Sequence, residues 1–305
     1  MMFHEPVLYR EIIHALQPTS NGLYVDGTIG AGGHAYGILE ASAPNGCLLG
    51  LDLDPAALDL ARDRLENFGD RAVLVQDSYI TMEQHINNLG WDAVDGILLD
   101  LGLSSMQLDT PARGFSFRED APLDMRFDPS ASLTAADLVN ELPENELANI
   151  IYNYGEEKYS RKIARAIVAA RPIHTTQELA SLVSKMLGRF GSRIHPATRT
   201  FQALRIAVNQ ELAAIETVLP IALGVLKPGG RLAVISFHSL EDRIVKQFFR
   251  YESRNCICPP ELPICVCDHQ AQLREIVRRP IRPEESEIKR NPRARSACLR
   301  VAEKL

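Results

Sequence analysis

The feature that most constrains this chain is the segment of residues 23–34, LYVDGTIGAGGH, where an apolar stretch runs into a glycine-rich loop. Leu23 to Val25 predict a buried strand, with Asp26 at its carboxyl end. Four glycines in the next seven residues allow the backbone to turn with φ > 0 and to approach a ligand closely. A helix from about Ala35 would point its free N–H groups at that ligand. The segment predicts a nucleotide-type cofactor site at the edge of a parallel sheet, without specifying the cofactor.

The first hundred residues repeat a strand–helix pattern. Apolar runs at residues 47–52, 72–75 and 94–99 predict three further strands, and Asp52 and Asp100 stand at the ends of two of them. Asp54 and Pro55 begin a helix as its N-cap and first residue. A less regular pattern predicts a helix over residues 80–89. Four such units predict an α/β fold with a doubly wound, Rossmann-like sheet.

The strand rhythm stops after Gly102 and resumes near residue 231. Between them the sequence predicts loops followed by helices over residues 158–170, 176–187 and 198–219. A Lys-Pro-Gly-Gly turn at residues 227–230 then precedes strands at 231–236, 273–277 and 297–301. We therefore expect a seven-stranded sheet domain formed by residues 1–103 and 206–305, with a helical domain, residues 104–205, inserted after the fourth strand.

Charge is distributed unevenly, although the net charge is only −6. Residues 1–140 contain 7 Lys and Arg against 21 Asp and Glu, whereas residues 141–305 contain 26 against 18. Residues 158–205 contain ten Lys and Arg and a single acid, Glu178. Such a concentration of positive charge favours a polyanionic partner such as nucleic acid in this half of the chain, and a solvated helical face is the alternative interpretation.

The composition is that of an ordinary globular protein, with 46% hydrophobic and 24% charged residues. The longest apolar run, residues 218–226, contains a Pro and a Gly and is too short to span a membrane. The N-terminal residues lack the pattern of a signal peptide. We therefore expect a cytoplasmic protein without membrane contact, whose six cysteines do not form a disulfide framework.

Two cofactors fit the glycine-rich loop. Gly30-x-Gly32-x-x-Ala35 satisfies the dinucleotide fingerprint and Asp52 is suitably placed for a ribose hydroxyl, so an NAD-linked oxidoreductase is one alternative. Against it, Asp26 would repel a pyrophosphate, whereas it suits the amino group of a methionine moiety. The chain also breaks at Asp100, where a methyl acceptor would enter. These features favour a methyltransferase sheet.

Four longer motifs carry a resemblance to a known family. They are VDGTIGAGGH (25–34), DGILLDLGLSS (95–105), HPATRTFQ (195–202) and ISFHSLEDR (235–243). With the shorter matches at residues 113–117, 122–126 and 291–296, the chain resembles the ribosomal RNA small subunit methyltransferase H (MraW-like) family along nearly its whole length. The resemblance implies a class I methyltransferase fold that uses S-adenosylmethionine to methylate the exocyclic N4 of a cytidine in the decoding region of 16S rRNA. The small ribosomal subunit or its rRNA would be the partner.

The resemblance also implies which residues contact the cofactor. Carried over by position, these are Gly32, Gly33, His34, Asp52, Tyr79, Asp100 and Gln107, to which the loop pattern adds Asp26. Tyr79 stands where the family pattern has Phe, a change that keeps a ring against the adenine. Neither the motifs nor the resemblance predicts a metal in the active site.

The acceptor nitrogen of a cytosine is a poor nucleophile because its lone pair is delocalised into the ring. An enzyme must accept hydrogen bonds from its N–H groups and hold it in line with the methyl–sulfur bond. We predict Asp100 for this role. Many amino-methyltransferases have the motif Asp/Asn-Pro-Pro-aromatic at this position, whereas this chain has Asp-Leu-Gly-Leu. The alternative is that Asp100 only caps the following turn. Methylation at C5 would need a cysteine nucleophile, and none lies between Cys47 and Cys256.

Other residues are candidates for acceptor and substrate contact. His238, just past the fifth strand, could orient the base, or be a loop histidine bonded to backbone. Phe115 could stack on an extruded cytosine, or anchor the core of the insertion. Candidates for contact with the RNA are Arg113, Arg199, Arg205, Asn209 and the face from Lys158 to Arg165. A DNA or small-molecule methyltransferase and a non-catalytic rRNA-binding assembly factor remain alternatives, and the sequence leaves the oligomeric state open, a homodimer included.

A quartet of cysteines lies in a Pro-rich stretch near the C-terminus. Cys256-x-Cys258 and Cys265-x-Cys267 bring four thiols within twelve residues. Such a group in a cytosolic chain is typical of a tetrahedral structural zinc site. A one-residue spacer is less usual than two, so reduced thiols without a metal are the alternative.

Overall fold

The computed structural model describes residues 6–188, 195–259, 262 and 264–305, with the side chain of Ser105 excepted. The chain divides into two compact units. Unit 1 consists of residues 1–102 and 212–305, and unit 2 of residues 103–211. The chain thus leaves unit 1 after its fourth strand and returns to it before the fifth.

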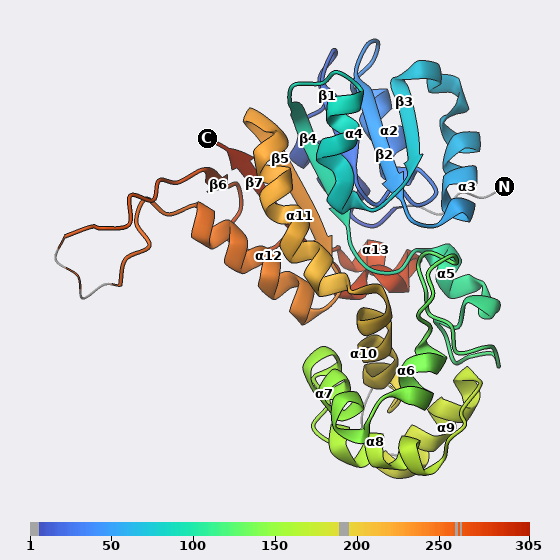
Figure 1. The fold of residues 1–305 in the computed structure, drawn as a ribbon. Helices are drawn as coiled ribbons and strands as arrows, with labels where there is room; N and C mark the ends of the chain where they lie inside the picture. Colours follow the sequence, from blue (N-terminus) through green and yellow to red (C-terminus); the bar gives the residue numbers. More distant parts are fainter. Residues whose placement is uncertain (1–5, 189–194, 260–261, 263) are drawn as a thin grey trace. The chain divides into compact units, whose positions relative to one another are not determined.

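Unit 1 is built on a seven-stranded sheet with the strand order β3-β2-β1-β4-β5-β7-β6 (Figure 1). Strands β1 to β5 are parallel to one another, whereas β7 is antiparallel to both β5 and β6. The prediction of a seven-stranded, Rossmann-like sheet is confirmed. The strands are β1 (Leu23–Asp26), β2 (Cys47–Asp52), β3 (Ala72–Gln76), β4 (Val94–Asp100), β5 (Leu226–Ser236), β6 (Leu273–Glu275) and β7 (Cys298–Lys304).

Helices cover both faces of this sheet, because residues along each central strand alternate between two apolar layers. Val25 and Leu49 belong to the layer that contains α4, α11 and α12, whereas Tyr24 and Leu48 belong to the layer with α1, α2 and α3. The helices of unit 1 are α1 (Tyr9–Leu16), α2 (Gly33–Ala41), α3 (Pro55–Leu65), α4 (Met82–Asn88), α11 (Glu211–Val225), α12 (Ser239–Glu252) and α13 (Glu285–Arg290). Short 3₁₀ turns are η1 (Glu66–Arg71), η2 (Tyr79–Thr81) and η4 (Pro292–Ser296).

Unit 2 is helical, and its described residues contain no strand. Its elements are α5 (Ser105–Asp109), η3 (Pro111–Arg113), α6 (Ala135–Glu141), α7 (Glu144–Gly155), α8 (Ser160–Ala169), α9 (Thr176–Leu187) and α10 (Thr198–Asn209). Capping boxes begin α5, α6 and α9, where Ser104, Thr134 and Thr175 each accept a hydrogen bond from the third residue of the helix. The apolar stripes of α6 to α10 meet in a core of their own.

The expected helix over residues 198–219 is in fact two helices, α10 and α11. The break is at Gln210, which adopts the left-handed conformation with φ 49° and ψ 35°. A continuous apolar stripe cannot reveal a single residue with positive φ. No single helix among the described residues has the length and apolar composition needed to span a membrane, and α10 and α11 meet those criteria only when taken together across the break.

Two boundaries also differ from the sequence prediction. Strand β5 begins at Leu226 instead of Arg231, because the Lys-Pro-Gly-Gly segment lies inside the strand as an irregularity in its pairing with β4. Partners shift there from Val94↔Leu226 to Gly96↔Arg231. The predicted helix over residues 80–89 is a 3₁₀ turn, η2, followed by the short helix α4. The predicted N-cap of α3 is confirmed, since Asp54 accepts a hydrogen bond from Ala56 N and Pro55 follows at the first helical position.

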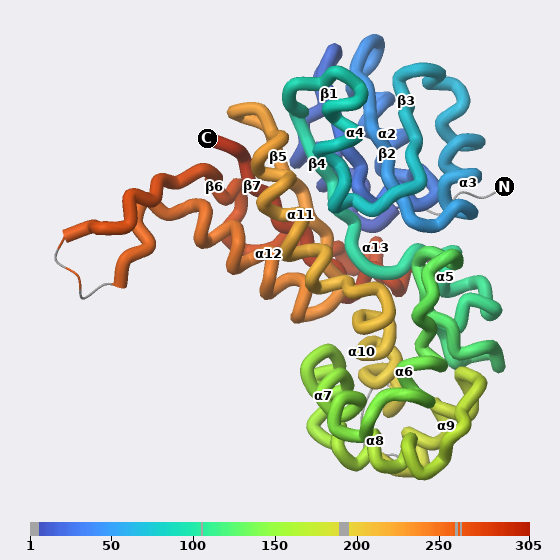
Figure 2. The backbone as a smooth tube through the Cα atoms, in the orientation of Figure 1, coloured from blue at the N-terminus to red at the C-terminus, as the bar shows by residue number. Residues whose placement is uncertain are grey.

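Between α12 and β6 the chain of unit 1 forms an extended arm (Figure 2). We call residues 253–271 the cysteine arm, since they include four of the six cysteines. Gln272 N donates to Glu252 O at 2.8 Å and closes its base. The described residues of the arm form neither helix nor strand.

The close approach of α7 and α10 in unit 2 depends on Gly155 at the end of α7. A Cβ atom there would lie 2.6 Å from the carbonyl oxygen of Arg199, a backbone atom of α10 that cannot yield by changing rotamer. We expect Gly155→Ala to destabilise unit 2 by about 1–3 kcal/mol. Gly224→Ala is the matched control, because this glycine also lies in a helix but has open space around it, so alanine should be neutral or stabilising by about 0.5–1 kcal/mol. Denaturant unfolding followed by circular dichroism measures both, and equal effects would contradict the close-packing argument.

Candidate active site

The glycine-rich loop of unit 1 is attached to the sheet on both sides. Gly27 N donates to Leu98 O of β4, and Ile29 N donates to Leu51 O of β2, both at 2.9 Å. The loop therefore extends from β1 between its two neighbours. Since β1, β2 and β4 are parallel, their carboxyl ends meet at this edge, where Asp26, Asp52 and Asp100 are the last residues of the three strands.

Glycine is required in the loop at two positions. Gly30 and Gly32 have φ values of 51° and 74°, in the region that L-residues with a side chain rarely adopt. Gly32 is the N-cap of α2, which begins at Gly33 and runs for nine residues. The backbone thus turns sharply from the sheet into a helix whose first N–H groups have no partner inside the helix. An anionic or hydrogen-bond-accepting part of a ligand would be stabilised at this position.

Hydrogen bonds from the loop orient the carboxyl groups. Asp52 accepts from Gly30 N and from Asp54 N, both at 2.9 Å. Asp26 accepts from Thr28 N at 3.2 Å, and the hydroxyl oxygen of Thr28 accepts from the backbone N–H of Asp100 at 2.6 Å. Residues 27–30 of the loop therefore connect the ends of β1, β2 and β4 by hydrogen bonds. This geometry is consistent with the prediction that Asp26, Asp52 and Asp100 face one site.

Two of these carboxyl groups have altered acidity. Burial raises the pKa of Asp26 to about 7, and the nearby Asp100 and Asp52 carboxylates add to the rise, whereas His34 and the N–H of Thr28 oppose it. Burial likewise raises the pKa of Asp52 to about 6, opposed by the N–H groups of Asp54 and Gly30. Clustered carboxylates whose pKa values approach neutrality are typical of functional sites, and a cationic ligand would stabilise their charged forms.

His34, in the first turn of α2, faces Asp100. Its Nε2 lies 3.6 Å from Asp100 Oδ2, too far for a hydrogen bond, and the ring stacks on Tyr9 with 6.2 Å between ring centres. Neither ring nitrogen of His34, nor Oδ1 of Asp100, has a hydrogen-bonding partner among the residues that the structure describes. Buried polar atoms without a partner are costly, so this group is suited to complete its hydrogen bonds with a polar ligand.

The remaining predicted cofactor residues divide between the two units. Tyr79, in η2, packs beside the loop, since a Cβ on Gly27 would lie 2.9 Å from Cβ of Tyr79. Gln107 belongs to unit 2, where it is buried and forms the capping box of α5 with Ser104. Its contact with a cofactor stays a prediction.

The structure gives His238 a local role as the N-cap of α12. Its Nε2 lies 3.1 Å from Oε1 of the buried Glu241, while Oε2 of that residue accepts from the backbone N–H groups of Phe237 and His238. Such a capping box fixes the chain just after β5. These contacts favour the interpretation of His238 as a loop histidine bonded to the backbone. Its contact with a substrate stays a prediction.

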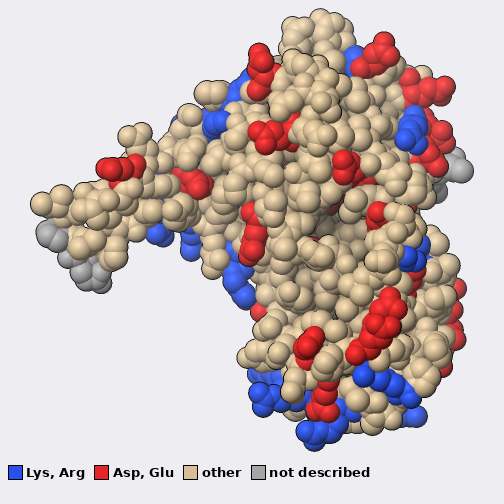
Figure 3. All heavy atoms as spheres, viewed as in Figure 1, with Lys and Arg blue, Asp and Glu red and all other residues tan. Residues whose placement is uncertain are grey.

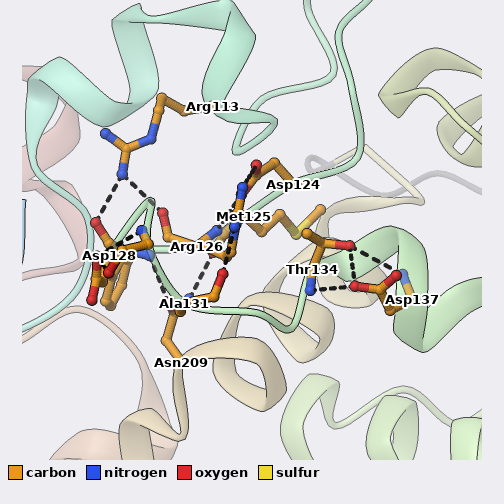
Figure 4. Close-up of polar contacts among 11 residues, drawn as sticks. Arg113, Asp124, Met125, Arg126, Asp128, Ala131, Thr134, Asp137 and Asn209 are labelled. Carbon is orange, nitrogen blue, oxygen red and sulfur yellow. Dashed lines mark hydrogen bonds and ion pairs between the residues drawn. The ribbon is translucent and has the colours of Figure 1, made fainter.

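In unit 2, Arg113 and Asn209 hold one loop in place (Figure 4). Arg113 donates to the carbonyl oxygens of Arg126 and Phe127 at 2.8 and 2.9 Å. The side chain of Asn209 donates to Met125 O and accepts from Phe127 N, both at 2.7 Å. Two residues far apart in sequence thus satisfy the backbone of residues 125–127. This geometry favours a positioning role for both over the direct RNA contact predicted from sequence.

Phe115 is a core residue of unit 2, with 7% of its surface exposed and its ring centre 5.7 Å from that of Phe127. Phe117 packs against His195 and Phe201. The packing of Phe115 favours the alternative in which it anchors the insertion, because a ring enclosed by its own core offers no face to a nucleobase.

Arg205 forms a bidentate ion pair with Glu211, with both hydrogen bonds at 2.8 Å and both side chains largely buried. This pair encloses the turn at Gln210 and favours a structural role for the guanidinium; the phosphate contact of Arg205 stays a prediction. Arg199 is more accessible, with 44% of its side chain exposed, and it donates to Glu156 O. Of the two arginines, Arg199 is the better candidate for RNA contact.

Sequence reasoning missed several contributors. Thr28 joins Asp100 to the glycine loop and Tyr9 supports His34, but neither residue type signals such a role by itself. Tyr152 and Tyr159 are each 60% exposed, close in sequence to the cations of α8. Exposed aromatic residues interleaved with Lys and Arg are a signal for nucleic-acid binding that the sequence contained.

Comparison with known proteins adds an independent finding. The model of the MraW methylase family matches residues 1–305. A ribosomal RNA small subunit methyltransferase H of Geobacter sulfurreducens is 55% identical over 307 residues, which cover 99% of this chain and 99% of that protein. The protein of the same name from Dehalococcoides mccartyi is 54% identical over 302 residues, covering 99% and 86%.

The chain is also similar to solved structures, at a much lower level. An rRNA methylase from Streptococcus thermophilus covers 99% of this chain and 99% of its own, with a TM-score of 0.45 and 11% identity.

The acidity of Asp26 gives a testable dependence of stability on pH. Its pKa is raised from 3.8 to about 7 in the folded protein, so the carboxyl contributes stability below pH 4 that is lost as the pH rises through 7. Between pH 5 and 8 this loss amounts to roughly 2–3 kcal/mol. Asp26→Asn removes the titrating carboxyl and with it this loss. The free energy of unfolding of the variant, measured with denaturant, should therefore rise by about the same amount relative to wild type between pH 5 and 8. The exposed Asp92→Asn is the control and should show a constant difference. A constant difference for Asp26→Asn as well would refute the burial argument.

Proposed function

Because the chain belongs to the MraW methylase family, we propose that it transfers a methyl group from S-adenosylmethionine to the exocyclic N4 of a cytidine in the decoding region of 16S rRNA. The relatives named ribosomal RNA small subunit methyltransferase H support rRNA of the small subunit as the substrate. The observation that carries the proposal is the convergence of Asp52, His34 and Asp100 on one glycine-rich loop at the carboxyl edge of the sheet.

The residues at this edge fit S-adenosylmethionine. The cofactor supplies a methyl group on a positively charged sulfur, next to an α-amino acid and an adenosine. Asp52 is suited to hold ribose hydroxyls, and the ring of Tyr79 to lie against the adenine. The N–H groups of the loop and of α2 can receive a carboxylate, and the unpartnered nitrogens of His34 can complete its hydrogen bonds. Three carboxyl groups give the site the negative potential that a cation requires.

Asp26 contributes to this site from behind the loop. It is 1% exposed and bonded to Thr28 N, whereas Asp100 and Asp52 are partly exposed. We therefore propose that Asp26 stabilises a bound cation through its charge and through the shape of the loop, and that Asp100 and Asp52 make the direct contacts. A cation would lower the pKa of Asp26, so binding should release a proton near pH 7.

Asp100 is the proposed acceptor for the N–H groups of the cytosine amine. Its Oδ1 lacks a partner among the described residues, and its backbone N–H is fixed by Thr28, so the carboxylate is held while one oxygen stays available. Accepting a hydrogen bond lets the amine nitrogen become more tetrahedral and aims its lone pair at the methyl carbon. When bound, the cofactor would supply the methyl group. The Asp100 carboxylate would stabilise the positive charge that the amine nitrogen gains on transfer, and the proton that the nitrogen loses would pass through this partly exposed carboxylate to solvent.

Unit 2 provides the proposed RNA-binding surface. Lys158, Arg161, Lys162 and Arg165 are all exposed on or next to α8, with the exposed Tyr159 between them. On the face of unit 2 drawn in Figure 3, groups of Lys and Arg alternate with Asp and Glu. Cations can neutralise phosphates and an exposed ring can stack on an unpaired base. We propose this surface in preference to Phe115 and Arg205, because Phe115 packs in the core of unit 2 and Arg205 forms an ion pair with Glu211.

The small ribosomal subunit or its rRNA is the proposed partner, and the cytoplasm the proposed location. Membership of a methylase family argues against the NAD-linked alternative, since a hydride-transfer enzyme would not share 55% of its residues with a methyltransferase over the whole chain. An enzyme differs from a non-catalytic assembly factor in that it transfers methyl groups repeatedly, and the next experiment measures this transfer.

Asp100→Ala should lower the rate of methyl transfer to small subunits by about 10²–10³-fold, because it removes the acceptor that activates and aligns the amine. Methylated nucleosides are mapped in rRNA after reaction in vitro, and cofactor affinity is measured separately by calorimetry. Asp92→Ala, an exposed carboxyl at the other end of β4, is the control and should leave both unchanged. An unaltered rate for Asp100→Ala contradicts its role, and absence of transfer by the wild type favours the assembly factor.

The double variant Lys158→Ala/Lys162→Ala should weaken binding to rRNA and reduce the slope of log K against log[salt] by about 1.4, since each phosphate contact contributes roughly 0.7 for a single strand. Filter binding over a range of salt concentrations gives the slope. Lys246→Ala, on α12 of unit 1, is the control for the loss of one cation. If the double variant keeps the wild-type slope, the RNA surface is elsewhere.

A further inference from the structure

The cysteine arm has no part in the proposed reaction, yet it brings four thiols together. Cys256, Cys258, Cys265 and Cys267 are all free, and their Sγ atoms lie within 4.8 Å of one another. The arm extends from unit 1 between α12 and β6 (Figure 1). The four cysteines and their immediate neighbours belong to the described residues, so the geometry of the cluster can be examined directly.

The separations within the cluster match the edges of a metal–tetrathiolate tetrahedron. The Sγ atoms of Cys256 and Cys265 are 3.5 Å apart, those of Cys265 and Cys267 are 3.5 Å apart, and those of Cys267 and Cys256 are 3.9 Å apart. Four sulfurs at the zinc–sulfur distance of about 2.3 Å stand about 3.8 Å from each other in a regular tetrahedron. The separations are far longer than a disulfide bond of about 2.05 Å.

The two Cys-x-Cys segments support each other with backbone hydrogen bonds. Ile257 N, between the first two cysteines, donates to Cys267 Sγ at 3.4 Å. Val266 N, between the second two, donates to Cys258 Sγ at the same distance. Each segment therefore directs an N–H group at the last cysteine of the other. Four thiolates around a divalent cation keep a net negative charge, and N–H donors to sulfur are the means of dispersing it.

The described residues of the arm bury no apolar core. Ile264, Val266 and Leu262 are 75%, 73% and 47% exposed. Apart from the thiol contacts, the described part of the arm is held by a few hydrogen bonds near its base, such as Gln272 N to Glu252 O and Ala271 N to Asn255 Oδ1. Ordering a residue costs roughly 1–2 kcal/mol of conformational entropy, which so few hydrogen bonds do not offset. Small segments without a core are typically held by disulfides or a structural metal.

We propose that Cys256, Cys258, Cys265 and Cys267 bind one Zn²⁺ that fixes the conformation of the cysteine arm. With all four positions taken by protein sulfur, the site is structural and has no open position for catalysis. An iron–sulfur cluster with two irons would hold its cysteine pairs further apart than this group allows. On binding, zinc forms four bonds to sulfur and the four thiol protons pass to solvent.

Metal content tests the proposal on the full-length chain purified with zinc in the growth medium. We expect about one zinc per chain by mass spectrometry for the wild type and for Cys47→Ser, which removes a thiol at the start of β2. Cys256→Ser and Cys265→Ser should each hold less than about a fifth of that amount. Equal zinc in all four proteins, iron in place of zinc, or a mass showing two disulfides would each overturn the assignment.

Proteolysis tests the consequence for the arm. After chelation, wild-type protein should be cleaved within residues 253–271 at least about tenfold faster, and added Zn²⁺ should restore protection, while circular dichroism of the rest of the chain stays unchanged. Cys265→Ser should be cleaved rapidly with or without zinc. Titration of the apo protein with Co²⁺ should saturate at one equivalent with the visible bands of a tetrahedral thiolate site. Protection independent of metal, or no thiolate band, would refute the proposed role.

Discussion

The candidate site depends on the hydrogen bonds that tie three strand ends to one loop. Gly30 N and Asp54 N hold Asp52, Thr28 N holds Asp26, and Thr28 Oγ1 receives the N–H of Asp100. These bonds involve the last residues of β1 and of its two parallel neighbours, β2 and β4, so the conformation of the loop depends on the spacing of these strands. The loop can make these bonds only with positive φ at Gly30 and Gly32. Cofactor site and sheet are in this sense one structure.

This arrangement concentrates negative charge in a place where burial opposes it. The pKa of Asp26 rises to about 7 and that of Asp52 to about 6, so the site without a ligand holds charge at a cost. A positively charged ligand removes part of that cost, which gives the site a preference for a sulfonium over a pyrophosphate on physical grounds. His34 and Asp100 add polar atoms that have no hydrogen-bonding partner among the described residues, and a ligand could bond to these atoms.

Unit 2 uses polar residues in a different way. Arg113, Asn209 and Arg205 satisfy backbone or carboxylate groups inside the unit, where they define the loop at residues 125–127 and the turn at Gln210. Other cations are exposed, among them Lys158, Arg161, Lys162 and Arg165 around α8 and Arg199 on α10. A basic segment of sequence therefore contains two populations, one that builds the fold and one that can meet phosphate, and the proposed RNA surface belongs to the second.

The sequence by itself determined which features follow one another along the chain. These are buried strands ending in Asp26, Asp52 and Asp100, a loop rich in glycine, an inserted helical segment and a cysteine quartet. Local pattern suffices there, because strand periodicity, capping and glycine requirements act over a few residues. Only the tertiary structure decided that Phe115 is core, that Arg205 pairs with Glu211, that the helix breaks at Gln210 into α10 and α11, and that four thiols meet at tetrahedral distances. These outcomes depend on partners distant in sequence or on one backbone dihedral angle, and neither is visible in the order of residues.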